Sequence, residues 1–170
     1  ANKKMKKLSG GMKRRAGIAQ AMLNNPKILI LDEPTAGLDP NERIRFRNLI
    51  SELSEDRLVL LSTHIVSDIE YIANEILLMK DGKLMHKGTA DEIINSMTET
   101  VWECFVEKNM VSDFMKKYKI SNMKSEADGV ILRIISHEKP FVNAQSVEAS
   151  LEDVFLYYFG EKAGDENAAI

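Results

Sequence analysis

A run of apolar residues that ends in two carboxylates constrains this chain more than any other feature. Residues 28–31 read Ile-Leu-Ile-Leu, and Asp32, Glu33 and Pro34 follow them directly. Four consecutive apolar residues, two of them β-branched, predict a strand that is buried on both faces. Because ligands of open α/β sheets bind beyond the carboxyl ends of the strands, Asp32 and Glu33 are expected to lie where a ligand binds.

The segments around this strand predict an α/β fold. One helix is expected to begin after Ser9 and another after Asp39, since both side chains can cap a helix N-terminus. A second apolar run, over residues 58–61, predicts a second strand, and Ser-Thr-His at residues 62–64 closes it. The order strand, helix, strand, helix favours parallel strands joined by right-handed crossovers.

The C-terminal part of the chain has a different pattern, with hairpins and short helices. Asp81-Gly82 predicts a hairpin turn, because Asp-Gly is favoured where two successive residues need positive φ. A second hairpin is expected around Asp128-Gly129. A domain boundary is expected near residue 98, followed by a small α+β domain over residues 99–160. Residues 161–170 are polar and are expected to form a flexible tail.

Composition limits the classes of function. The formal net charge of −3 gives no basic field over the whole chain, so nucleic acid is not expected as a partner. A basic run crowds the first fifteen residues and flanks the Ser-Gly-Gly turn at residues 9–11: Lys3, Lys4, Lys6, Lys7, Lys13, Arg14 and Arg15. The single cysteine, Cys104, is expected to be a buried structural thiol. No apolar run approaches about eighteen residues, so any membrane role is expected to come through a partner.

An ordered set of motifs resembles the ATP-binding subunits of ATP-binding-cassette (ABC) transporters. Leu8-Ser9-Gly10-Gly11-Met12 is similar to the signature motif, with Met12 where Gln is usual. Residues 28–33 resemble the Walker B strand, residues 36–39 the D-loop, and His64 the switch histidine. The resemblance covers roughly the first 97 residues.

The resemblance assigns nucleotide binding to Ser9, Gly10, Gly11 and Asp39. The physical chemistry of the first three agrees, because a serine hydroxyl and glycine amides at a helix N-terminus form an anion site. Asp39 is expected to cap a helix, and its communication with an opposite subunit is implied by the resemblance alone.

The resemblance also assigns the catalytic roles. It implies that Asp32 holds Mg²⁺, a task that suits a hard carboxylate oxygen. It implies that Glu33 faces the γ-phosphate and acts as the base for the attacking water. His64 is implied to contact the γ-phosphate and to orient that water.

The implied fold is a partial P-loop NTPase (ABC ATPase) fold with parallel strands and helices over residues 1–98, plus a small α+β accessory domain. The implied cofactors are ATP and Mg²⁺. The implied partners are a second ATPase subunit, in a head-to-tail dimer, and a transmembrane permease. The implied location is cytoplasmic and peripheral, at the inner face of the cell membrane.

One motif of a complete nucleotide site is missing from the sequence, the Gly-x-x-x-x-Gly-Lys-Ser/Thr loop that cradles phosphates. We therefore expect the chain to be the C-terminal part of a longer ATPase, with little turnover by itself. Ser-Leu-Glu-Asp-Val-Phe at residues 150–155 resembles an ending of ABC-2-type and antibiotic-exporter ATPases, which favours an exporter.

Two alternatives stay open at this point. The first is an ABC-type ATPase of chromosome maintenance or translation, which salt-dependent binding of DNA or RNA would support. The second is a non-catalytic interaction module that offers only its signature surface to a complete partner. Adding the chain to an intact subunit and following ATP hydrolysis would distinguish this module from an enzyme.

Overall fold

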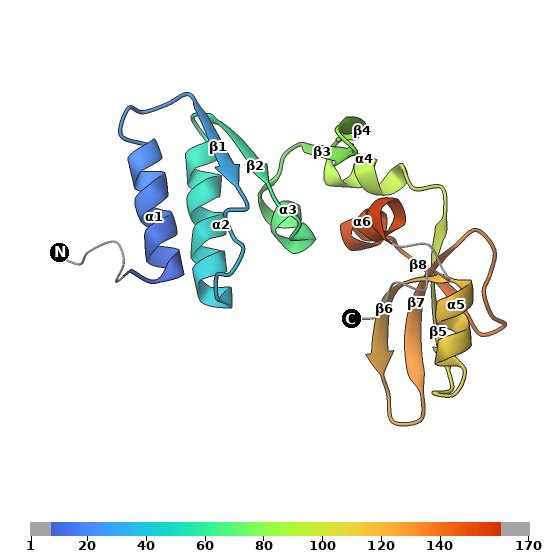
Figure 1. Cartoon of the computed structure of the whole chain (residues 1–170). Coiled ribbons are helices and arrows are strands. Elements are labelled where there is room, and N and C mark those ends of the chain that lie inside the picture. The colour runs from blue at the N-terminus through green and yellow to red at the C-terminus, as the bar shows by residue number, and fades with distance from the viewer. Residues whose placement is uncertain (1–7, 161–170) are drawn as a thin grey trace. The chain divides into compact units, whose positions relative to one another are not determined.

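The first packing unit holds the motifs that resemble an ATPase. The computed structural model describes residues 8–160, and the chain packs as two units that meet between Ile72 and Ala73. The elements of the first unit are α1 (Gly10–Ala21), β1 (Ile28–Asp32), α2 (Pro40–Ser54), β2 (Leu58–Ser62) and α3 (Val66–Ile72) (Figure 1). Strands β1 and β2 are parallel, with Asp32 opposite Ser62, which confirms the predicted parallel pairing.

Local capping explains where the helices of this unit begin. Ser9 accepts a hydrogen bond from the Met12 amide at 3.3 Å, and Asp39 accepts one from the Glu42 amide at 2.9 Å. Both caps satisfy amides that have no acceptor within the helix, as the sequence predicts. A proline, Pro40, starts α2, where its missing N–H costs nothing.

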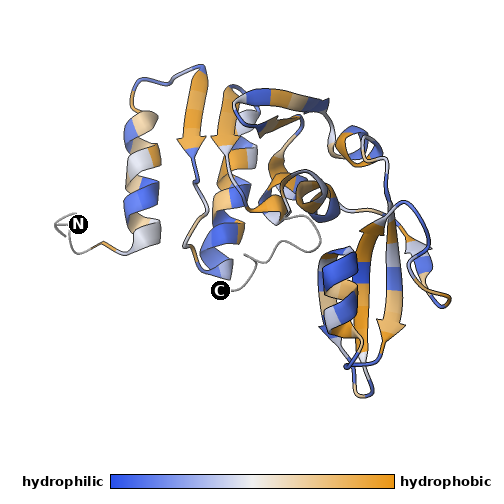
Figure 2. Ribbon diagram, turned by 45° about the vertical axis from the view of Figure 1, so that its right-hand side comes forward, coloured by the Kyte–Doolittle hydropathy of each residue, from blue (hydrophilic) through white to orange (hydrophobic). Residues whose placement is uncertain are grey.

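Strand β1 is buried on one face, so the prediction of burial on both faces is wrong for this chain. Leu29 is buried, whereas Ile28 and Ile30 are exposed, Ile30 to 71%. The same alternation continues in β2, where Leu58 and Leu60 are exposed. Helices α1 and α2 supply the core residues Ile18, Phe46 and Ile50, which cover only the face that carries Leu31, Val59 and Leu61. Both strands are apolar along their length in Figure 2.

Over its described residues, 73–160, the second unit consists of a hairpin, a four-stranded antiparallel sheet and three helices. Its elements are β3 (Ile76–Lys80), β4 (Lys83–Gly88), α4 (Ala90–Asn95), β5 (Thr100–Val106), α5 (Val111–Lys117), β6 (Lys119–Ser125), β7 (Val130–Ser136), β8 (Gln145–Val147) and α6 (Leu151–Phe159). The sheet order is β6-β7-β5-β8. Positive φ values at Asp81 and Gly82 confirm the predicted turn between β3 and β4.

The main core of this unit lies on one face of its sheet. Alternate residues of β5 and β7 face α5 and form a core with Phe114 and Ala144: Cys104, Val106, Leu132 and Ile134. The burial of Cys104 confirms its predicted structural role, and this burial raises the pKa of its thiol. Helix α6 contacts β6 and α4 and buries Leu151 and Val154.

The packing boundary lies earlier in the chain than the predicted domain boundary near residue 98. The reason is that β4 and α4 pack against α6 within the second unit. Tyr158 of α6, for example, hydrogen-bonds the Nε2 of His86 on β4 at 2.7 Å. The assignment of residues 1–98 to an ATPase domain and of residues 99–160 to an accessory domain stays a prediction.

Some predictions concern residues at the termini. The lysines at positions 3 to 7 and the predicted tail over residues 161–170 lie outside the described residues. Between residues 8 and 160, no helix combines the length and the apolar character that crossing a membrane requires.

Gly129 lies where the β6–β7 turn passes close to β5. A Cβ at this position would lie 2.5 Å from the carbonyl oxygen of Val106 and 2.4 Å from the ring of Phe105. Because the carbonyl belongs to a paired strand and cannot move freely, Gly129→Ala is expected to destabilise the sheet by about 1 to 3 kcal/mol. Urea unfolding would measure this change.

The matched control for this variant is Asp128→Ala, at the preceding position of the same turn. Asp128 is exposed, so this substitution should alter the unfolding free energy by less than about 0.5 kcal/mol. Equal stability of Gly129→Ala and the unsubstituted protein would contradict the close approach.

Candidate functional site

The carboxyl ends of β1 and β2 bring polar groups together at one edge of the sheet. Asp32 ends β1, and its carboxylate Oδ1 accepts a hydrogen bond from the Ser62 hydroxyl of β2 at 2.5 Å. The amide of Glu33 donates to the Ser62 carbonyl at 3.0 Å. The parallel register therefore holds Asp32 and Glu33 through the end of the neighbouring strand.

The structure places Glu33 in direct contact with His64. The Nδ1 of His64 lies 2.8 Å from Oε1 of Glu33, although 31 positions separate the two residues. Because an ionised carboxylate only accepts hydrogen bonds, Nδ1 carries the proton in this contact, which leaves Nε2 for another partner. The two residues form one hydrogen-bonded pair at the end of the sheet.

The backbone at Glu33 adopts a conformation that non-glycine residues seldom use. Its φ is +44°, in the left-handed region. This turn redirects the chain from β1 into the loop over residues 34–38, where the Ala36 amide donates to the Glu33 carbonyl at 3.4 Å. The second carboxylate oxygen of Glu33, Oε2, is buried and has no hydrogen-bond partner among the described residues. This oxygen therefore keeps unused capacity to accept a hydrogen bond.

The N-terminus of α1 forms a second polar group of the unit. Ser9 caps the helix, and the amides of Gly10 and Gly11 belong to its first turn, where no acceptor exists within the helix. A Cβ added at Gly10 would meet no atom within 4 Å, so this turn is open to an approaching anion. Within residues 8–160, no hydrogen bond joins this turn to Asp32, Glu33 or His64.

Asp39 lies after the loop that begins at Glu33. Its side chain caps α2, which confirms the predicted cap. Its predicted role in nucleotide binding stays a prediction.

Asp32 is suited to hold Mg²⁺. Its side chain is exposed at the strand end, and only Oδ1 is engaged, by Ser62. The part of the chain that the structure describes contains no group of three or more His, Cys, Asp or Glu residues arranged for a metal. Since Mg²⁺ keeps several waters and takes one or two carboxylates beside substrate phosphates, a single exposed carboxylate fits this ion.

The sequence patterns do not predict the contacts of two side chains near the site, Ser62 and Arg14. Ser62 positions Asp32, and its place opposite Asp32 in a parallel register is a signal that could have identified it. Arg14 of α1 donates to the carbonyl of Ala36. No local pattern predicts that contact, because 22 positions separate the two residues.

Comparisons with known proteins agree with these motifs. A family model described as "ABC transporter" matches residues 1–36. The chain is 38% identical over 110 residues to the uncharacterized ABC transporter ATP-binding protein YxlF of Bacillus subtilis strain 168. It is 34% identical over 171 residues to the bacitracin transport ATP-binding protein BcrA of Bacillus licheniformis. It is 39% identical over 97 residues to the Nod factor export ATP-binding protein I of Burkholderia thailandensis.

These matches cover different shares of the proteins compared. They include 65% of this chain for YxlF, 91% for BcrA and 56% for the Nod factor protein. The chain spans 37%, 56% and 32% of the lengths of these three relatives, respectively.

Proposed function

Because this chain belongs to the family of ABC transporter ATP-binding proteins, we propose that it forms the signature-bearing and water-activating part of an ATPase that drives membrane transport. ATP is the proposed substrate, and Mg²⁺ is the proposed metal. The proposed reaction is transfer of the γ-phosphoryl group to water.

One observation carries this proposal, the contact between Glu33 and His64. Their 2.8 Å hydrogen bond lies at the carboxyl ends of two parallel strands, where α/β proteins bind ligands. The free Oε2 of Glu33 supplies an acceptor for a proton, which a nucleophilic water must lose.

Each side chain at the carboxyl ends of β1 and β2 has its own role in the proposed reaction. Oε2 of Glu33 accepts a proton from the attacking water, while the His64 ring holds Oε1 and so orients the carboxylate. Asp32, oriented by Ser62, is the residue that would hold Mg²⁺. When bound, Mg²⁺ supplies charge neutralisation at the phosphate oxygens.

The N-terminus of α1 provides the proposed phosphate-binding turn. Ser9, Gly10 and Gly11 would donate hydrogen bonds to nucleotide phosphate held by a second, oppositely oriented subunit. Asp39 would contribute to nucleotide binding at the same boundary between the two subunits. This arrangement requires a head-to-tail dimer, which is the proposed assembly.

The remaining assignments are part of the same proposal. Two relatives are named for bacitracin transport and Nod factor export, which supports an exporter. Its second partner would be a transmembrane permease, and its location would be the cytoplasmic face of the membrane. Residues 99–160 would form an accessory domain.

Hydrolysis of Mg-ATP by the full-length product of the gene tests this proposal, since the relatives are longer than this chain. His64→Ala removes the ring that holds Glu33 and should lower kcat about 10- to 100-fold, because the base is no longer oriented. Phosphate release would measure the rate.

The matched control is His137→Ala, which removes an exposed histidine of the second unit. It should leave kcat within about twofold of the unsubstituted protein. Absence of Mg-dependent hydrolysis in the unsubstituted protein, or equal rates in the two variants, would contradict the proposal.

A further inference from the structure

Three contacts join the first turns of α1 to the segment that runs from Ala36 to Glu42. The guanidinium of Arg14 donates through Nη1 to the carbonyl of Ala36. The guanidinium of Arg15 pairs with Oε2 of Glu42 in the first turn of α2. The third contact is the close approach of Gly11, where an added Cβ would lie 3.0 Å from the same Glu42 oxygen.

The contact of Arg14 differs in kind from that of Arg15. Arg15 and Glu42 form an ion pair in which the arginine side chain is 46% exposed, and such exposed pairs add little stability. Arg14 is partly buried, and its charged donor meets a backbone carbonyl, which makes a charge-assisted hydrogen bond. A bond to the backbone restrains the path of the chain and not only a side chain.

The carbonyl that Arg14 holds belongs to the loop that follows Glu33. Two hydrogen bonds tighten this loop, from the Ala36 amide to the Glu33 carbonyl and from the Leu38 amide to the Thr35 carbonyl at 3.2 Å. Thr35 is only 1% exposed, so the middle of the loop is packed in place. A shift of the Ala36 carbonyl would therefore be transmitted to Glu33, three positions earlier.

Glu33 needs such restraint because its backbone is strained. A glutamate at φ +44° persists only where the surrounding contacts hold it. The Ser62 carbonyl holds the Glu33 amide on one side, and the loop restrained by Arg14 holds it on the other.

We infer that Arg14 is a positioning residue, whose guanidinium ties the phosphate-binding turn of α1 to the loop that orients Glu33. The inference rests on the proposed function and adds a physical connection within it. Ser9 and Gly10 would contact nucleotide in one site of the dimer, whereas Glu33 would act in the other. Arg14 would therefore transmit the state of one site to the base of the other.

The first measurement compares kcat and KM for ATP among variants of the full-length protein. Arg14→Ala should lower kcat roughly tenfold and leave KM within about twofold, because the base is misplaced while the nucleotide contacts persist. Arg14→Lys keeps a positively charged hydrogen-bond donor but lacks the planar guanidinium, so its kcat should lie between those of Arg14→Ala and the unsubstituted protein. Lys13→Ala removes an exposed cation from the same turn and should match the unsubstituted protein.

The second measurement is amide hydrogen exchange, which does not depend on activity. Arg14→Ala should raise exchange in the peptide that covers residues 33–39 by about tenfold, since one charge-assisted hydrogen bond no longer restrains it. Exchange in the middle of α2, over residues 44–54, should not change. Lys13→Ala should leave both regions unchanged.

Several results would overturn the inference. Normal kcat in Arg14→Ala, beside a strong loss in Glu33→Gln, would overturn it and leave the proposed function intact. If Lys13→Ala lost as much rate as Arg14→Ala, the effect would come from positive charge in general. If Arg14→Ala raised hydrogen exchange equally in residues 33–39 and in residues 44–54, the variant would be unfolding as a whole. No hydrolysis by the unsubstituted protein would overturn the proposed function and the catalytic role of Arg14 together, whereas hydrogen exchange would still test the anchoring of the loop.

Discussion

Glu33→Gln is expected to lower the kcat of ATP hydrolysis by the full-length protein about 10²- to 10⁴-fold, the usual contribution of a positioned general base. Glutamine has the same shape as glutamate, and its amide oxygen can still accept the hydrogen bond that His64 donates to Oε1. It cannot take a proton from water at the position of the buried, unpartnered Oε2. The substitution therefore removes the base while it preserves the geometry around it.

Phosphate release and ATP binding should respond differently to this change. The affinity for Mg-ATP, measured by calorimetry, should stay within about threefold, because the carboxylate acts on water and not on the nucleotide. The matched control is Glu70→Gln, an exposed carboxylate of α3 in the same unit, which should leave the rate unchanged. A rate in Glu33→Gln close to that of the control would contradict the assignment of Glu33 as the base.

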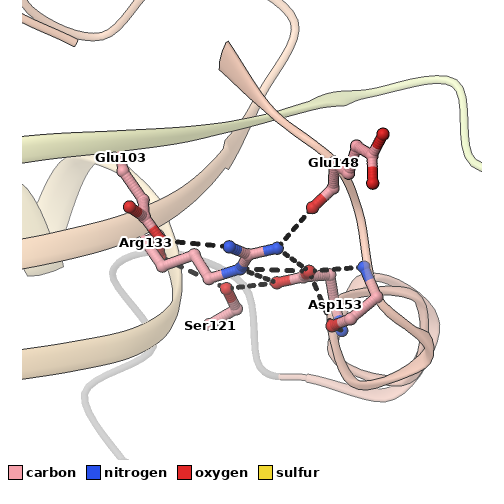
Figure 3. Close-up of polar contacts among 6 residues, drawn as sticks. Glu103, Ser121, Arg133, Glu148 and Asp153 are labelled. Carbon is pink, nitrogen blue, oxygen red and sulfur yellow. Dashed lines mark hydrogen bonds and ion pairs between the residues drawn. The ribbon is translucent and has the colours of Figure 1, made fainter. Parts of the chain in front are cut away.

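The second large effect is expected at Asp153, in the second unit. Its carboxylate is 1% exposed and accepts hydrogen bonds from the Arg133 guanidinium, with Nη2 at 2.7 Å and Nε at 3.0 Å from its oxygens. The Ser121 hydroxyl donates at 2.6 Å (Figure 3). The Ser150 amide donates at 2.8 Å. These contacts fasten the first turn of α6 to strands β6 and β7.

Asp153→Ala should destabilise the second unit by about 3 to 5 kcal/mol, because it leaves the partly buried Arg133 without its main acceptor. Trp102 is the only tryptophan of the sequence and lies on β5, in the same sheet. Urea unfolding followed by the fluorescence of Trp102 would therefore report on this unit.

Glu152→Ala is the matched control, because it removes a carboxylate at the preceding position of the same helix. Glu152 is exposed, so the change in unfolding free energy should be below about 0.5 kcal/mol. A loss of stability in Asp153→Ala no larger than in this control would contradict the role of the buried pair.

The contact between Asp153 and Arg133 makes the stability of the second unit depend on pH. Burial raises the pKa of Asp153, but hydrogen bonds from Arg133, Ser121 and Ser150 outweigh burial, so its pKa lies below the ordinary value of 3.8. A lowered pKa in the folded state contributes stability that is complete above pH 3.8 and is lost as the pH falls through the folded pKa. In Asp153→Asn this part of the acid sensitivity should disappear, which urea unfolding at a series of acidic pH values would measure.

The motif at residues 150–155 gains a physical explanation from these contacts. Ser150 caps α6 and Asp153 closes the capping box, while Leu151 and Val154 are buried. The cap joins residues three positions apart in the chain. The local sequence does not indicate Arg133, because this partner lies on a strand 20 positions away.

Elements whose signals lie within a few residues could be predicted from the sequence. The capped starts of α1 and α2 and the Asp81-Gly82 turn depend on local backbone preferences. The parallel pairing of β1 and β2 was predicted from the order of strands and helices along the chain. One strand was missed, β8 over Gln145–Val147, because three residues of mixed polarity are too few for an alternating pattern.

The sequence by itself indicated the candidate groups for the proposed chemistry: a carboxylate pair at a strand end, a histidine after the next strand, and Ser-Gly-Gly before a helix. Only the tertiary structure decided that β1 is buried on one face, that His64 contacts Glu33, and that Arg14 holds the loop after Glu33. The physical reason is separation along the chain. Local preferences determine caps, turns and strands, whereas contacts between residues 20 to 30 positions apart exist only once the packed elements bring them together.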